Sequence, residues 1–139
     1  MREILFRGKT NKGEWVEGSL HIEYGEATKD GKRNTDYRIL GMRGECKYII
    51  PETIGQFTGL TDKNGKKIFE GDILSERPPM NQTAYIGYVA YDEKSAVWRF
   101  MIKNDTKYNG VLLGSYSNSY KVIGNIHDNP EFLKGGVEE

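Results

Sequence analysis

The sequence has few of the residues on which enzymes and secreted proteins depend. Its 139 residues include one cysteine, Cys46, and two histidines, His21 and His127. A single cysteine cannot close an internal disulfide, which favours a reducing compartment, so we expect a cytoplasmic protein. No apolar run approaches the ~18 residues that cross a bilayer, and the first residues do not start a signal peptide. We therefore expect no membrane partner.

An excess of charge is also missing. Twenty Lys and Arg residues balance twenty Asp and Glu residues, which disfavours both a strongly basic nucleic-acid-binding protein and an acidic tail. The glycine-rich motifs G-x-G and G-x-x-x-x-G-K, which bind nucleotides, do not occur. The sequence thus predicts no catalytic residues, no metal ligands and no cofactor, and we expect that the protein is not an enzyme.

What the chain does contain is typical of β structure. It has 17 glycines and nine tyrosines, and residues 15–24 alternate apolar and polar side chains as a half-buried strand does. Asp62-Lys63-Asn64-Gly65 is a hairpin turn signal. The pattern predicts about eight or nine short strands, and so an all-β, mainly β fold. We expect a small barrel or two packed small β-barrel-like subdomains, with only one or two short helical turns.

Two segments are candidates for those helical turns. Pro51 with Glu52 and Thr53 suits a first helical turn, because proline fits the first helical position. Asn129, just before Pro130, suits an N-cap whose side chain bonds to the turn.

Residues 1–139 are predicted to form a single unit with two candidate subdomains. The first, residues 1–60, holds the N-terminal hairpins and a basic loop, and the second, residues 61–139, is similar to SH3-like barrels. That similarity rests on a Gly71-Asp72 bend followed by strands that include Gly87-Tyr88-Val89 and Trp98-Arg99-Phe100. SH3-like domains often bind peptides or nucleic acid, which by fold analogy alone names no ligand.

Residues 29–47 form the most basic window of the chain, with six basic and three acidic groups and a net charge of +3. Basic side chains for phosphates and aromatic rings for stacking are the ingredients of nucleic-acid binding. The candidate contacts are Lys32, Arg33, Tyr37, Arg38, Arg43 and Lys47. A solvated hairpin or loop explains the same window, and we prefer that explanation because the net charge is small.

Other reactive groups also have simple structural explanations. Glu70 and Asp72, if both lie on one strand, share a face and could share a proton or a metal ion. We prefer a bend at Gly71 in which Asp72 accepts hydrogen bonds from the amides that follow. Cys46 begins an apolar segment, so we expect a small buried residue and not a nucleophile. Both histidines are expected at the surface.

Three stretches, residues 2–8, 52–73 and 122–133, resemble the YopX family of phage and prophage proteins. The resemblance implies a mostly β accessory protein with no established activity and no assigned catalytic residues. We expect the family-signature positions to be structural, with their short polar groups holding backbone donors and acceptors. These positions are Gln56, Thr58, Gly59, Asp62, Gly65, Glu70, Gly71, Asp72, Gly124 and Asn125.

The most direct functional hypothesis is a non-catalytic binding module for a host or phage protein, in the host cytoplasm. The alternative is a nucleic-acid-binding β-barrel protein that uses the basic loop 29–47. A small enzyme, a virion component or a homo-oligomeric structural protein are further alternatives. A steep loss of binding with salt would favour nucleic acid over a protein partner.

Overall fold

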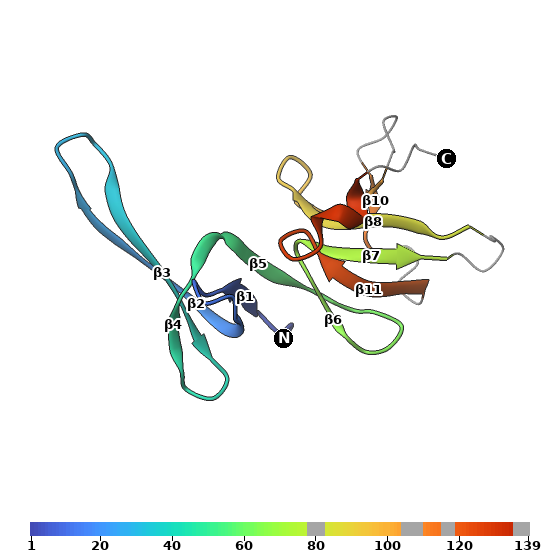
Figure 1. Cartoon of the computed structure of the whole chain (residues 1–139), viewed down its shortest axis with the longest axis horizontal. Helices are drawn as coiled ribbons and strands as arrows, with labels where there is room; N and C mark the ends of the chain where they lie inside the picture. The colour runs from blue at the N-terminus through green and yellow to red at the C-terminus, as the bar shows by residue number, and fades with distance from the viewer. Residues whose placement is uncertain (78–82, 104–109, 115–118, 135–139) are drawn as a thin grey trace. The chain divides into compact units, whose positions relative to one another are not determined.

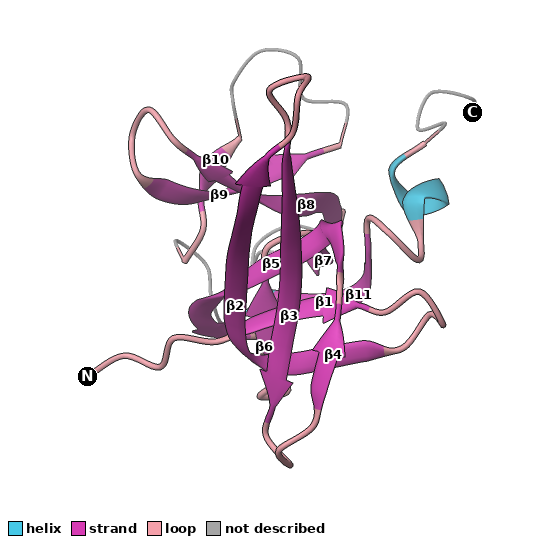
Figure 2. Ribbon diagram, turned by 90° about the vertical axis from the view of Figure 1, so that its left-hand side faces the viewer, coloured by secondary structure: helices cyan, strands magenta, loops and turns pink. Residues whose placement is uncertain are grey.

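The structure is a computed structural model, and it describes residues 1–77, 83–103, 110–114 and 119–134. Within these residues the chain is all-β, as predicted, with a short 3-10 helix, η2 (Pro130–Leu133), near its end (Figures 1 and 2). The strands are β1 (Phe6–Lys9), β2 (Trp15–Ala27), β3 (Arg33–Gly41), β4 (Cys46–Tyr48), β5 (Ile50–Thr61), β6 (Lys67–Phe69), β7 (Asp72–Glu76), β8 (Tyr85–Asp92), β9 (Val97–Ile102), β10 (Val111–Leu112) and β11 (Tyr120–Asn125).

The strands form two sheets. The first has the order β4-β3-β2-β1-β5-β6 and the second the order β10-β9-β8-β7-β11. The chain divides into two compact units, Met1–Phe57 and Thr58–Glu139, which we call unit 1 and unit 2. The likeness of the second subdomain to SH3-like barrels stays a prediction.

Unit 1 is built from successive antiparallel hairpins. β1 pairs with β2, and Thr10 shapes the turn between them because its hydroxyl accepts hydrogen bonds from the N–H groups of Lys12 and Glu14, each at 3.2 Å. β2 then pairs with β3, and β3 with β4. The basic window, expected as a hairpin or loop, is thus mostly strand.

The helical turn predicted at Pro51 is wrong, because Pro51 lies in β5. The register between β1 and β5 shifts between Arg7 and Lys9, so the pairing of the two strands is irregular at this point. The Thr53 hydroxyl bridges the irregularity: it accepts from the Lys9 N–H at 2.8 Å and donates to the Ile50 carbonyl at 2.6 Å. Proline is tolerated at such irregular strand positions.

The core of unit 2 is a cluster of five buried side chains: Ile68, Leu74, Val89, Phe100 and Tyr120, each at most 1% exposed. The rings of Phe100 and Tyr120 meet edge to face, with centroids 5.3 Å apart. Each side chain comes from a different strand, β6, β7, β8, β9 or β11, so the cluster ties the unit together across large sequence separations. This core fixes the turns that carry the family-signature residues.

Candidate functional site

Asp62 joins the turn between β5 and β6 to the last strand. One carboxylate oxygen accepts from the N–H groups of Asn64 and Lys66, both at 2.9 Å. The other accepts from the N–H of Val122 in β11 at 3.0 Å, 60 residues away in the sequence. The Lys63 N–H adds a bond to the Tyr120 carbonyl at 2.9 Å. Asp62 is only 6% exposed, so its carboxylate holds backbone groups and is not presented to a ligand.

Two opposing effects set the pKa of Asp62. Burial raises the pKa of this carboxyl, but the hydrogen bonds from Val122, Lys66 and Asn64 outweigh it and leave the pKa below the usual 3.8. A carboxyl whose pKa is lower in the folded state stabilises the fold above its unfolded-state pKa. This stabilisation is lost as the pH falls below about 4 and through the folded pKa.

The corner formed by Glu70, Gly71 and Asp72 is the bend at Gly71 that we preferred on sequence grounds. Glu70 and Gly71 make the turn between β6 and β7, so Glu70 and Asp72 do not lie on one strand. Asp72 is 1% exposed and accepts from the N–H of Phe69, which precedes it in the turn, at 2.7 Å. Gly71 has a φ of +90°, a conformation that other residues adopt only with strain. The carboxylate thus closes a tight turn.

The second signature segment closes a loop after β11. The Asn125 side-chain oxygen accepts from the N–H groups of His127 and Asp128, at 3.0 and 2.9 Å. The Asn129 side-chain oxygen in turn accepts from the Asn125 N–H at 3.2 Å, so the two asparagines bond to each other's segment. A Cβ at Gly124 would lie 2.4 Å from that Asn129 oxygen, so a larger residue there would displace the Asn129 side chain. Asn129 therefore caps this loop, and it makes no side-chain cap bond to η2.

The two signature segments meet in unit 2, where the Ile126 N–H donates to the Gly71 carbonyl at 2.9 Å. Thr58 also acts on backbone groups, since its hydroxyl donates to the Ile68 carbonyl at 2.8 Å. Gly59 and Gly65 have positive φ values. The Gln56 position pairs with Phe6 between β5 and β1. The side chains of Thr58, Asp62, Asp72 and Asn125 are thus all bonded to backbone groups.

The structure does not gather the six candidate nucleic-acid contacts on one surface. Tyr37 and Arg38 are successive residues of β3, so their side chains point to opposite faces of the sheet. Lys47 pairs with the buried Ile39 and shares the face of Tyr37, whereas Arg38 pairs with Tyr48 on the other face. Lys32 and Arg33 lie at the end of the β2–β3 hairpin, and Arg43 lies in the turn between β3 and β4.

Several of these cationic groups already have partners within the chain. Arg38 donates to the Glu23 carboxylate at 3.0 Å, and its guanidinium lies 5.4 Å from the centroid of the Tyr48 ring. Arg33 donates to the Gly25 carbonyl at 3.1 Å. These contacts stabilise the β2–β3 hairpin and reduce the positive charge offered to a phosphate.

The sequence reasoning missed the shape of this hairpin. β1 pairs with β2 over residues 15–18, and β3 is bonded to β4 and Ile49 over residues 37–40, so beyond Tyr37 the ribbon is two-stranded. We call residues 22–37 the arm; in Figure 1 its two strands run on together past the ends of β1 and β4. Ile22 faces Tyr37 and Tyr24 faces Thr35, and Tyr24 is 68% exposed. The alternation at residues 20–24 was the signal for this arm.

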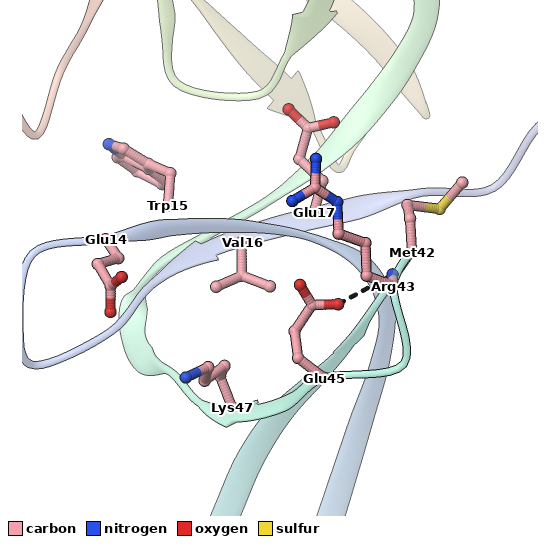
Figure 3. A pocket seen from close by; sticks show the side chains of 8 residues that line it. All are labelled: Glu14, Trp15, Val16, Glu17, Met42, Arg43, Glu45 and Lys47. Carbon is pink, nitrogen blue, oxygen red and sulfur yellow. Dashed lines mark hydrogen bonds between the residues drawn. The ribbon is translucent and has the colours of Figure 1, made fainter.

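A small hollow lies between the start of β2 and the turn that joins β3 to β4 (Figure 3). Its volume is about 230 Å³, and Figure 3 shows Val16 pointing into the space between Glu45 and Lys47. Glu45 also accepts from the Arg43 N–H at 3.0 Å. The volume is below the roughly 300–1,000 Å³ of small-molecule sites, and its walls carry charges of both signs. The hollow is thus a poor candidate for a cofactor site.

A larger hollow, about 410 Å³, lies on β8 and β9 of unit 2. Its most prominent polar feature is an ion pair in which the Arg99 Nε donates to an Asp92 carboxylate oxygen at 2.8 Å. The bond from Arg99 is the main cause that lowers the pKa of the Asp92 carboxyl below its usual value. Each charge is satisfied by the other, which leaves neither group poised for chemistry.

Cys46 is exposed, so the expectation of a buried core residue is wrong. The apolar residues that suggested a core strand, Ile49 and Ile50, lie beyond the end of β4, and of these only Ile49 is buried. β4 itself is exposed at all three of its residues. His21 is exposed, as expected, and lies 3.4 Å from Glu23, whereas His127 is half-buried in its turn.

Among the residues that the structure describes, no group of three or more His, Cys, Asp or Glu side chains is placed to hold a metal ion. Over the same residues, no helix is long and apolar enough to cross a membrane.

Comparison with known proteins identifies the chain's relatives. No curated protein matches the sequence. The chain is similar to the crystal structure of protein EF1440 from Enterococcus faecalis, with 27% sequence identity and a TM-score of 0.53 over 96% of this chain and 100% of that one. The family model described as YopX protein matches residues 5–134. Because this match spans nearly the whole chain, the protein belongs to the YopX family.

Proposed function

We propose that this protein is a phage- or prophage-encoded accessory protein that acts in the host cytoplasm as a non-catalytic binding module. Its partner is a host or phage protein, and the arm of unit 1 is the main contact. Membership of the YopX family supports the accessory role. The observation that carries the proposal is the two-stranded arm with Ile22, Tyr24 and Tyr37 on one face.

An isolated two-stranded ribbon is only marginally stable in water, because it has no third layer on which to bury its apolar face. The arm separates its side chains by face: Ile22, Tyr24 and Tyr37 lie on one, and the Arg38–Glu23 ion pair lies on the other. Tyrosine is favoured at protein interfaces because it offers a large apolar ring with a polar end. Binding a protein would give this face the layer that it lacks within unit 1.

The polar residues of unit 2 support the non-catalytic part of the proposal. Asp62, Asp72 and Asn125 each accept hydrogen bonds from backbone N–H groups, and such groups serve the fold and not a substrate. An activity would need a nucleophile, a base and an acceptor site in hydrogen-bond reach of one another. The described residues offer no such arrangement around either hollow.

Nucleic-acid binding is the second candidate, and one observation favours it. Lys32 and Arg33 lie together at the end of the arm, and the exposed Tyr24 lies on the same hairpin. The opposite faces of Tyr37 and Arg38 and the internal partners of Arg33 and Arg38 argue against a continuous phosphate-binding track.

The test is capture of partners from host lysate by the wild-type protein and by Tyr24→Ser, with and without nuclease. We expect nuclease-resistant capture of a defined protein, reduced at least tenfold by Tyr24→Ser, which is roughly the effect of losing an interface aromatic residue. Tyr91→Ser is the matched control, because Tyr91 is an exposed tyrosine (42%) of unit 2. Capture that disappears with nuclease, or that falls steeply with salt, would replace the protein partner by nucleic acid. Equal loss in both serine variants would remove the arm from the binding surface.

A further inference from the structure

The outer edge of β4 has its backbone groups directed away from the sheet. The Gly41 N–H donates to the Glu45 carbonyl at 2.7 Å, and the Ile49 N–H donates to the Tyr37 carbonyl at 2.9 Å. Residues 45, 47 and 49 therefore direct their backbone groups toward β3. By alternation, Cys46 and Tyr48 direct their N–H and C=O groups to the outside. β4 stands at the end of its sheet, so no described strand pairs with this edge.

An open edge is a template for another strand, and proteins often block it with a lysine. Lys47 is such a residue at the centre of β4, but Glu45 lies two positions earlier and points to the same face (Figure 3). An antiparallel second β4 centred on Cys46 would place Glu45 of each copy opposite Lys47 of the other. The edge is thus self-complementary in charge: a second copy neutralises the lysine that would repel other strands.

We propose that two copies of this protein pair through β4, antiparallel, with Cys46 of one copy opposite Cys46 of the other. Tyr48, whose ring is 64% exposed, then lies next to the β3–β4 turn of the second copy, on the same face as Cys46. Leu40, which pairs with Cys46 and is 50% exposed, lies on the same face and adds apolar area. This inference is independent of the partner proposed for the arm.

Charge favours the strand register centred on Cys46 over the register shifted by one residue. A shift of one step centres the pair on Lys47, which places two lysines directly opposite each other, and like charges in that position are destabilising. Centring on Cys46 instead creates two opposite-charge pairs. Replacement of Lys47 by a neutral residue should therefore weaken the proposed dimer but strengthen the shifted one.

The experiment measures the dimer dissociation constant by sedimentation equilibrium. We expect reversible dimers, weakened about three- to tenfold by Lys47→Ser from the loss of two ion pairs. Lys29→Ser is the matched control, since it removes the same charge from the turn of the arm. Glu45→Lys and Lys47→Glu should each be monomeric alone, because each opposes like charges in both pairs. They should form a mixed dimer when combined, because the mixture restores the two opposite-charge pairs of the wild type. Circular dichroism confirms that each variant is folded, since Glu45→Lys also removes the bond to the Arg43 N–H.

The position of Cys46 gives a second readout. A short bismaleimide, which adds one thiol to each of its two double bonds, should link wild-type copies through Cys46. Met42→Cys in a Cys46→Ser background, at a position 77% exposed, reports random collisions and should link more slowly. A monomer at every concentration, a dimer tightened by Lys47→Ser, or equal linking of the two cysteine positions would each overturn the proposal.

Discussion

Unit 1 and unit 2 differ in how much of their large apolar side chains is exposed. In unit 2, Phe100, Tyr120 and Leu74 are completely buried in one cluster. In unit 1, Ile39 is completely buried, but Tyr24, Met42 and Tyr48 are 64–77% exposed. A domain gains most of its stability from buried apolar area, whereas exposed apolar groups are available to partners. Of the described residues, the most exposed large apolar side chains thus lie in unit 1, whereas the buried cluster lies in unit 2.

The side chains that hold turns differ in the same way. Asp62 in unit 2 is buried and joins its own turn to a distant strand. Asp30, in the turn of the arm, is exposed and bonds only to its neighbours, the Thr28 hydroxyl and the Lys32 N–H. The same turn chemistry thus has a long-range role in one unit and a local role in the other.

The largest expected effect is the loss of a core ring from unit 2. Phe100→Ala should lower the free energy of unfolding by about 3–5 kcal/mol, because a large cavity replaces a completely buried side chain. Urea unfolding followed by circular dichroism measures the loss. Phe132→Ala is the matched control at a half-buried position, and it should cost about 1 kcal/mol. Similar losses in the two variants would mean that the cluster around Phe100 is not the main source of stability.

The next effect concerns the two turn aspartates. Asp62→Ala should cost about 2–3 kcal/mol, because three backbone N–H groups lose their acceptor at a buried position. Asp30→Ala should have a clearly smaller effect, because water can replace its carboxylate. Thermal unfolding of both variants tests the difference between the units. If Asp62→Ala and Asp30→Ala lower the stability equally, the long-range bond from Val122 to Asp62 does not contribute to stability.

A smaller effect is expected from the buried acid at the end of β7. Burial raises the pKa of the Glu76 carboxyl, and the bond from the Ser119 hydroxyl opposes this only in part. Ionised Glu76 therefore costs stability above its folded-state pKa, and the cost vanishes as the pH falls toward the usual value of 4.5. Glu76→Gln should raise the melting temperature at pH 7 and leave it unchanged near pH 4. A lower melting temperature at pH 7 would show that the charge itself is stabilising.

The smallest expected effect is on the labelling rate of the Cys46 thiol, which folding should hardly slow. Because this thiol is exposed on unit 1, a maleimide should label native protein almost as fast as unfolded protein, when the protein is dilute enough to be monomeric. Mass spectrometry over time gives both rates. Native labelling slower by more than tenfold would place Cys46 in a protected environment and contradict the exposed edge of β4.

Local patterns predicted the strands, and long-range pairing decided the rest. Alternation at residues 15–24 identified β2, and the turn at residues 62–65 was correct because its residues fix the backbone locally. Pro51 was misplaced in a helical turn, because the pairing of Lys9 with Ile50 that makes it part of a strand comes from β1. The burial of Cys46 was wrong for the same kind of reason, since an end strand is recognised only once the sheet order is known.

In the candidate sites, too, features set by local sequence were predictable and features set by long-range contacts were not. That Tyr37 and Arg38 face opposite ways follows from strand periodicity alone, so the scattering of the basic residues was predictable in part. That Asp62 reaches Val122 was not, because no local signal links residues 60 positions apart.

The place of β11 in its sheet has a consequence for synthesis on the ribosome. β7 lies between β8 and β11, yet of the strands that the structure describes β11 is the last to be made. Until Tyr120–Asn125 has emerged, the nascent β7 keeps one open edge, and the Asp62 carboxylate lacks its Val122 donor. Exposed edges of this kind invite misassembly between neighbouring chains. The pairing of β11 with β7 is therefore a late closing step, because unit 2 lacks this edge contact until β11 has emerged.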